Sequence, residues 1–113
     1  MSRFTDAATQ MADSVERFHR HFGIEASRDG IDYHSRLTLL MEEVGEHANA
    51  INKGHPVEEV LKEMADIAYV ALGTLEMAGD DGAQAMMQVV DKNNSKTTTT
   101  HKLNPNTGKI LKS

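Results

Sequence analysis

Two acidic clusters flank a single turn in this chain and hold the residues best suited to chemistry. The first is Glu42-Glu43-Val44-Gly45-Glu46, and the second is Glu63-Met64-Ala65-Asp66. Glu46 and Glu63 are equally far from the peptide bond between Gly54 and His55, and so are Glu43 and Asp66. If the flanking segments are antiparallel helices, four carboxylates meet at one height, about 13 Å from the turn at ~1.5 Å per residue. Such a convergence suggests a divalent cation.

The alternative is two helix faces that are simply solvated. Two observations weigh against it. Like charges stand four residues apart at Glu42 and Glu46, which destabilises a helix unless it is compensated, and only Lys62 is a basic residue among the acids. Oxygen donors without any cysteine are typical of Mg²⁺, with Mn²⁺ also possible. Glu42 stands beside the expected ligands. From the residues alone, it is equally a base that accepts the proton of a water molecule or an exposed helix glutamate.

Helical spacing of apolar residues predicts an all-α fold that positions these acids. We expect four helices, from Thr5 or Asp6 to Phe22, from Asp32 to about Asn52, from Pro56 to Gly79, and from Asp80 to Asp91 or slightly beyond. The first would be capped by Thr5 or Asp6, and the second by Asp32. We expect one domain over residues 1–96, followed by a tail over residues 97–113 that is irregular or packed on a partner subunit.

Composition limits the functions that are open to the chain. Its 113 residues carry a net charge of −5, which argues against a general binder of nucleic-acid polymers. It has no cysteine and no secretory signal, so a reducing, cytoplasmic location is expected. No apolar run approaches the roughly 18 residues that a membrane span needs. Aromatic residues make up only 4% of the chain, so the core of each subunit should be thin.

The acidic pattern resembles the all-α nucleoside triphosphate pyrophosphohydrolase superfamily. That superfamily includes the MazG proteins, the dimeric dUTPases, the dCTP pyrophosphatases and phosphoribosyl-ATP pyrophosphatase. The resemblance rests on Glu-Glu-x-x-Glu followed some sixteen residues later by Glu-x-x-Asp. It extends to Val15–Gly23, which is similar to the first helix of MazG-like members, and to Asn94-Ser95-Lys96 and Gly108–Lys112.

The resemblance implies a role for individual residues. Glu43, Glu46, Glu63 and Asp66 would bind Mg²⁺, and Glu42 would be the catalytic base. Three residues near the end of the last helix, Asp91, Asn94 and Lys96, would face the phosphates of the substrate. An ammonium group at Lys96 suits a phosphate directly, although a solvated lysine is the equal alternative from the residues alone.

The resemblance also implies an activity and an assembly. The family cleaves the α–β anhydride of a nucleoside triphosphate, which gives the monophosphate and pyrophosphate, so we expect a hydrolase that cleans the nucleotide pool. Family members have a four-helix core that oligomerisation completes, so we expect a homodimer or homotetramer. Two alternatives stay open: phosphoribosyl-ATP pyrophosphatase of histidine biosynthesis, and a non-catalytic helical module that binds nucleotides.

Overall fold

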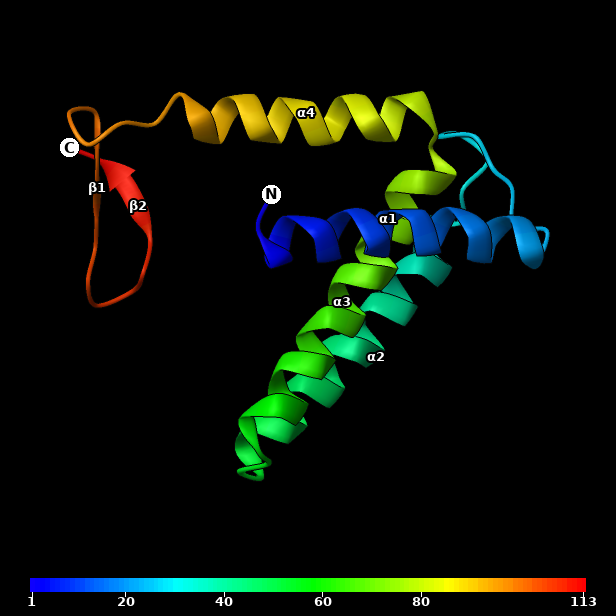
Figure 1. Cartoon of the computed structure of the whole chain (residues 1–113), viewed down its shortest axis with the longest axis horizontal. Coiled ribbons are helices and arrows are strands. Elements are labelled where there is room, and N and C mark those ends of the chain that lie inside the picture. Colours follow the sequence, from blue (N-terminus) through cyan, green and yellow to red (C-terminus); the bar gives the residue numbers. More distant parts are fainter. The chain divides into compact units, whose positions relative to one another are not determined.

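The computed structural model describes residues 1–113, and 66% of the chain is helical (Figure 1). The four helices are α1 (Arg3–His21), α2 (Tyr33–Asn52), α3 (Val57–Met77) and α4 (Asp80–Asn94). The predicted all-α class is therefore confirmed. The chain forms two compact units, residues 1–83 and residues 84–113, and each is described here by itself.

Helices α2 and α3 form an antiparallel hairpin in the first unit (Figure 1). Asp32 caps α2, because its carboxylate accepts a hydrogen bond of 3.1 Å from the backbone N–H of Ser35. Hydrogen bonds from the Ser35 hydroxyl and backbone lower the pKa of Asp32. Gly54 closes the turn with a φ of 68°, which a residue with a Cβ rarely adopts. The predicted cap and turn are thus both confirmed.

Two polar contacts join α2 to α3 at separate levels. Nearer the turn, Nδ1 of His47 lies 3.1 Å from the carbonyl oxygen of Val60. Farther from the turn, the Arg36 guanidinium donates to the Val70 carbonyl and to the Thr74 hydroxyl, each at 3.0 Å. Because a contact at each level fixes the register of the two helices, the residues between the two contacts are held at a defined height.

Helix α1 packs against α3 through buried and half-buried polar pairs. The Ser14 hydroxyl and the Tyr69 hydroxyl are 2.9 Å apart. Nδ1 of His19 bonds a carboxylate oxygen of Glu76, and the His19 side chain is buried. Val15, between these two pairs in sequence, is the most deeply buried apolar residue. These contacts fix α1 beside the second half of α3.

The start of α1 differs from the prediction. The cap is Ser2, whose hydroxyl accepts a hydrogen bond from the backbone N–H of Thr5, so the helix begins at Arg3. Thr5 and Asp6 lie within the first turn instead. All three residues are good capping types, and the helix extends to the earliest one because each added residue forms another backbone hydrogen bond.

The second unit contains most of α4 and a short hairpin. Strands β1 (His101–Leu103) and β2 (Ile110–Lys112) pair antiparallel, with His101 opposite Lys112. These strands lie within residues 97–113, for which a tail that is irregular or packed on a partner subunit was predicted. The turn at Asn104–Gly108 closes the hairpin, because Gly108 adopts a φ of 73° and its N–H donates to the Asn104 carbonyl. The predicted boundary between residues 96 and 97 stays a prediction.

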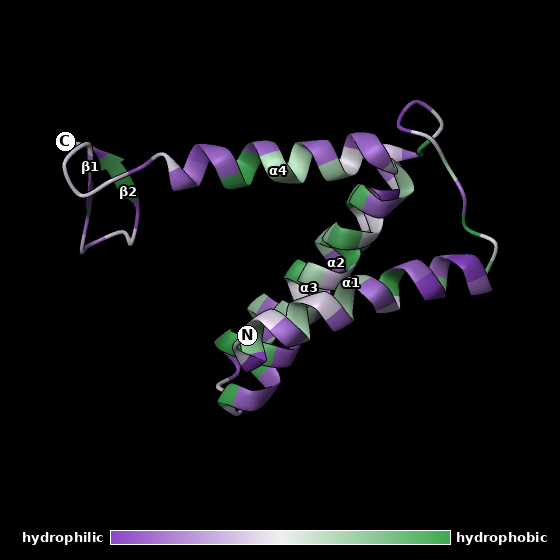
Figure 2. Cartoon of the chain, turned by 45° about the horizontal axis from the view of Figure 1, so that its top comes forward, coloured by the Kyte–Doolittle hydropathy of each residue, from purple (hydrophilic) through white to green (hydrophobic).

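Few apolar side chains are buried in this chain. The buried ones are Val15, Ile31 and Ala50, which agrees with the thin core expected from composition. In Figure 2 apolar residues recur along α2 and α3. Several of the largest stay exposed, among them Leu37 and Ile51 on α2 and Leu61 on α3. None of the helices combines the length and the apolar character needed to cross a bilayer.

Gly82 provides a direct test of how α4 begins. A Cβ at this position would lie 1.9 Å from the backbone oxygen of Leu75, and that oxygen belongs to α3 and cannot move freely. We expect Gly82→Ala to lower the free energy of unfolding by about 1–3 kcal/mol, the usual cost of overpacking. Chemical denaturation followed by circular dichroism would measure the change.

The matched control is Gly45→Ala in the middle of α2. Open space surrounds a Cβ at Gly45, so this change should stabilise the chain by about 0.5–1 kcal/mol through the higher helix propensity of alanine. Equal stabilities for the two variants would contradict the close approach of α4 to α3.

Candidate metal centre

Three carboxylates from α2 and α3 converge between the two polar contacts that join the helices. One oxygen from each of Glu43, Glu63 and Asp66 lies within 4.8 Å of the others. Glu63 and Asp66 are three residues apart, which places them on one face of α3. Because both helices rise regularly, residues at equal sequence distances from the bond between Gly54 and His55 lie at similar heights on α2 and α3.

Glu46 and Glu42 lie at the edge of this group. Glu46 is exposed and is not one of the three, but after burial its charge is the next cause that raises the pKa of Glu43 and of Glu63. Glu42 is also exposed and is outside the group of three. It stands four residues before Glu46, so the two are neighbours on the solvent-facing side of α2. Three of the four predicted ligands thus come together, with Glu46 at their edge and Glu42 one turn from Glu46.

The surroundings of Glu43 and Glu63 disfavour the charged form of both carboxyl groups. Burial is the largest cause that raises the pKa of Glu43, followed by the charges of Glu46, Asp66 and Glu63. The same order holds for Glu63, where burial comes first and the charges of Glu46 and Asp66 follow. Lys62 acts in the opposite direction and is the weakest of the causes at Glu63. The chain itself therefore supplies little positive charge to this group.

Two oxygen atoms of the group are buried without a hydrogen-bond partner. They are one oxygen of Glu43 and one of Glu63. A buried carboxylate oxygen without a partner is costly, and native proteins rarely leave one. A divalent cation bound by oxygen ligands would satisfy both atoms and offset the repulsion. The residues present thus fit a hard cation such as Mg²⁺.

The other predicted site residues lie near the end of α4, in the second unit. Asp91 and Asn94 are exposed, while Lys96 is half-buried and its ammonium donates to the Asn93 side chain at 3.0 Å. Lys96 and Asn93 line a cavity of about 460 Å³ together with His101 and Lys102 of the hairpin. Asn94 does not line it. Asn93 and Asn94 are the same residue type, so only their different positions around the α4 axis could have distinguished them in the sequence.

The model of the MazG nucleotide pyrophosphohydrolase domain matches residues 32–103, well over half of the chain. The chain belongs to the MazG family. Members typically depend on a divalent metal, and the family supports nucleoside triphosphate pyrophosphohydrolase activity in general. No curated protein and no solved structure matches the chain significantly.

The matched segment contains every residue that the sequence predicts for the site. It begins at the cap of α2 and ends at the last residue of β1. Helix α1, by contrast, lies wholly outside it. The family match therefore does not extend to α1.

The carboxylate group predicts opposite effects of one substitution with and without metal. Without a divalent cation, Glu63→Gln should raise the thermal midpoint, because it removes one of several mutually repelling charges. With millimolar Mg²⁺, the wild-type midpoint should rise and that of the variant should not, because an amide is a poorer ligand for Mg²⁺. Thermal unfolding in chelator and in Mg²⁺ would measure both effects.

Glu42→Gln is the control, since Glu42 is an exposed glutamate next to the group. Its midpoint should follow that of the wild type in both conditions. A response to Mg²⁺ that Glu63→Gln leaves intact would mean that the cation binds elsewhere.

Proposed function

We propose that this MazG chain is a Mg²⁺-dependent hydrolase that cleaves the α–β anhydride of canonical or damaged (d)NTPs. The products are a nucleoside monophosphate and pyrophosphate, and the role is to clean the nucleotide pool. The observation that carries the proposal is the pair of buried, unpartnered oxygens on Glu43 and Glu63 inside a group of converging carboxylates. Membership of the MazG family supplies the class of reaction.

Four carboxylates would hold the ion: Glu43 and Glu46 from α2, and Glu63 and Asp66 from α3. When bound, Mg²⁺, or Mn²⁺ in its place, offsets the negative charge of the phosphates and polarises a phosphoryl oxygen. The polar contacts at His47 and at Arg36 keep the two helices in register on either side of the group. The ligands are therefore held in place before the substrate arrives, which lowers the cost of binding.

Glu42 would act as the general base. Its exposed carboxylate lies one turn from Glu46, so it has access to water at the edge of the ligand group. It accepts a proton from that water as the water oxygen bonds to the α-phosphorus of the substrate. The bridging bond breaks, and pyrophosphate leaves with the bonding electrons. General base catalysis of this kind contributes about 10²–10⁴-fold to a rate.

Residues near the end of α4 would contact the phosphates. From Lys92 to the end of the printed sequence, the chain has five lysines and no Asp or Glu. Lys96 is half-buried, and Asn93 fixes its ammonium. Asn94 can donate an amide hydrogen to a phosphate oxygen, whereas Asp91 would need the bound cation between itself and a phosphate. The strongest of these contacts is therefore expected at Lys96.

A homodimer or homotetramer would complete the fold. The exposed side chains of Leu37, Ile51 and Leu61 belong to the same helices that carry the carboxylates. Burial of such side chains is favourable by about 25 cal/mol per Å² of apolar surface. A second copy presents the same apolar residues, so it is a suitable cover. We propose that residues 1–96 form the catalytic domain, that residues 97–113 pack against a partner subunit, and that the enzyme works in the cytoplasm.

The reaction is tested by its product. Incubation with Mg²⁺ and a panel of NTPs, dNTPs and phosphoribosyl-ATP should release pyrophosphate as the primary product. Asp66→Asn should abolish turnover, and Glu42→Gln should lower kcat by about 10²-fold or more with little change in metal-dependent stabilisation. Orthophosphate as the first product would sink the proposal. Turnover of phosphoribosyl-ATP alone would identify the histidine-pathway enzyme, and no turnover at all would favour a binding module.

The phosphate contact is tested by Lys96→Gln. We expect KM for a triphosphate to rise roughly tenfold, because a charged hydrogen bond to a phosphate is lost. Lys92→Gln is the control, since Lys92 is exposed on α4 and lines none of the cavities described here. Steady-state kinetics at fixed ionic strength would compare the two variants, and equal KM values would remove Lys96 from the site.

A further inference from the structure

A polar cluster joins the first three helices beside the second half of α3. It consists of His19 from α1, Arg36 from α2 and Glu76 from α3. The His19 side chain is buried, and those of Arg36 and Glu76 are half-buried. His19 lies outside residues 32–103, which the family model matches, so family membership assigns it no role. None of the three is among the predicted site residues.

Gly73 is the point at which both α1 and α2 reach the α3 backbone. A Cβ at Gly73 would lie 2.7 Å from Nη2 of Arg36 and 3.4 Å from both Cε1 and Nε2 of His19. The guanidinium and the imidazole therefore meet in the space that a side chain would otherwise fill. A glycine inside a helix is destabilising relative to alanine, and here it permits this close approach.

Each member of the cluster also has its own partner on α3. Nδ1 of His19 bonds a carboxylate oxygen of Glu76, which fixes the imidazole ring. The Arg36 guanidinium donates from Nε to the Thr74 hydroxyl and from Nη2 to the Val70 carbonyl, each at 3.0 Å. Because a buried ring occupies the adjoining space, it limits the positions that the guanidinium can adopt. The imidazole thus favours the position from which Arg36 reaches both acceptors.

The Arg36 contact lies close to the carboxylate group along both helices. Val70 follows Asp66 by four residues, about one turn of α3, and Arg36 precedes Glu43 by seven, about two turns of α2. A shift of α2 along α3 would change the separation of the Glu43 and Asp66 carboxylates. Mg²⁺ demands near-ideal octahedral geometry, so it is sensitive to such a shift. One side chain therefore links the packing of α1 to the geometry of the metal centre.

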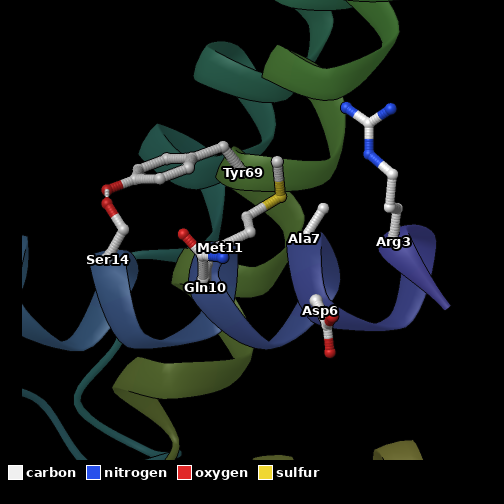
Figure 3. A pocket seen from close by; sticks show the side chains of 7 residues that line it. All are labelled: Arg3, Asp6, Ala7, Gln10, Met11, Ser14 and Tyr69. Carbon is white, nitrogen blue, oxygen red and sulfur yellow. Dashed lines mark hydrogen bonds between the residues drawn. The ribbon is translucent and has the colours of Figure 1, made fainter. Parts of the chain in front are cut away.

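The other polar contact between α1 and α3 does not involve α2. The Ser14 and Tyr69 hydroxyls are 2.9 Å apart, and both residues line a cavity of about 600 Å³ along α1 (Figure 3). All the residues that line this cavity belong to α1 or α3. Loss of this contact would loosen α1 on α3 without releasing the Arg36 guanidinium.

We propose that His19 and Glu76 are positioning residues for the metal centre, and that they act through Arg36. Glu76 fixes the imidazole, the imidazole keeps the guanidinium over Gly73, and the guanidinium holds α2 at the height at which the carboxylates converge. The inference rests on the proposed function, because it takes the carboxylate group to be the Mg²⁺ site. It gives α1 a part in metal binding although α1 supplies no ligand.

Titration calorimetry with Mg²⁺ alone tests this role without turnover. His19→Leu and Glu76→Leu should each weaken Mg²⁺ binding by about threefold to tenfold, the size of effect expected of a remote residue that is coupled to a site. Glu76→Gln retains an oxygen that accepts the hydrogen bond of His19, so it should restore the affinity nearly to that of the wild type. Circular dichroism would verify the fold of each variant.

Gly73→Ala displaces the guanidinium while His19 and Glu76 remain. The new methyl group would lie 2.7 Å from Nη2 of Arg36, the end of a flexible side chain that can swing away. Alanine favours the helix, so the fold should persist while Mg²⁺ affinity falls by about threefold to tenfold. Arg36→Met removes the same contact. The double variant should therefore bind Mg²⁺ no more weakly than either single variant.

Ser14→Ala is the matched control on α1, because it removes the contact that does not involve α2. Its Mg²⁺ affinity should equal that of the wild type. Nitrogen NMR supplies a second readout, which overall stability does not move. The Nε–H resonance of Arg36 should be distinct from those of exposed arginines in the wild type and in Ser14→Ala, and it should merge with them in Gly73→Ala.

The outcomes separate this inference from the proposed function. If no triphosphate is hydrolysed but the cluster variants still weaken Mg²⁺ binding, the positioning role stands and the reaction does not. If triphosphates are hydrolysed while Gly73→Ala and His19→Leu retain the wild-type affinity for Mg²⁺, the positioning role is overturned. Equal losses in Ser14→Ala and in the cluster variants would also overturn it, because a general loosening of α1 would then explain them. A wild-type chain that binds no Mg²⁺ would overturn it as well.

Discussion

The repulsion among carboxylates between α2 and α3 is the constraint on which this molecule depends. At Glu43 and at Glu63, burial and the neighbouring charges both raise the pKa of the carboxyl group. The repulsion among these carboxylates would separate the two helices if only packing at the level of the carboxylates held them together. The contacts at His47 and at Arg36 hold the helices on either side of it instead. These hydrogen bonds therefore hold α2 and α3 together, although the repulsion among the carboxylates between them opposes close packing.

The position of these carboxylates could be predicted from the sequence because a regular helix has a constant rise per residue. A constant rise per residue turns equal separations from a turn into equal heights, and Gly54 marks the turn through a backbone conformation that few residues adopt. The position of the acids thus follows from local rules alone. His47, which directly follows the first acidic cluster, contacts the Val60 carbonyl and so packs between the two helices.

The sequence could not predict where α1 lies. Residues 22–32 separate α1 from α2, and no rule relates the register of α1 to that of α3. The contacts between Ser14 and Tyr69 and between His19 and Glu76 join residues more than fifty positions apart. Gly73 lets the His19 ring and the Arg36 guanidinium approach the α3 backbone, since a Cβ there would lie 2.7 Å from the Arg36 side chain. Only the structure reveals these contacts.

The distribution of charge bears on the proposed triphosphate substrate. A carboxylate group repels every phosphate until a cation is bound, so an anion that cannot share that cation gains nothing there. The lysines that follow Asp91 attract anions in general, and by themselves they would not distinguish a nucleotide from a nucleic acid. At the carboxylates, only an anion that can share a bound cation is therefore favoured.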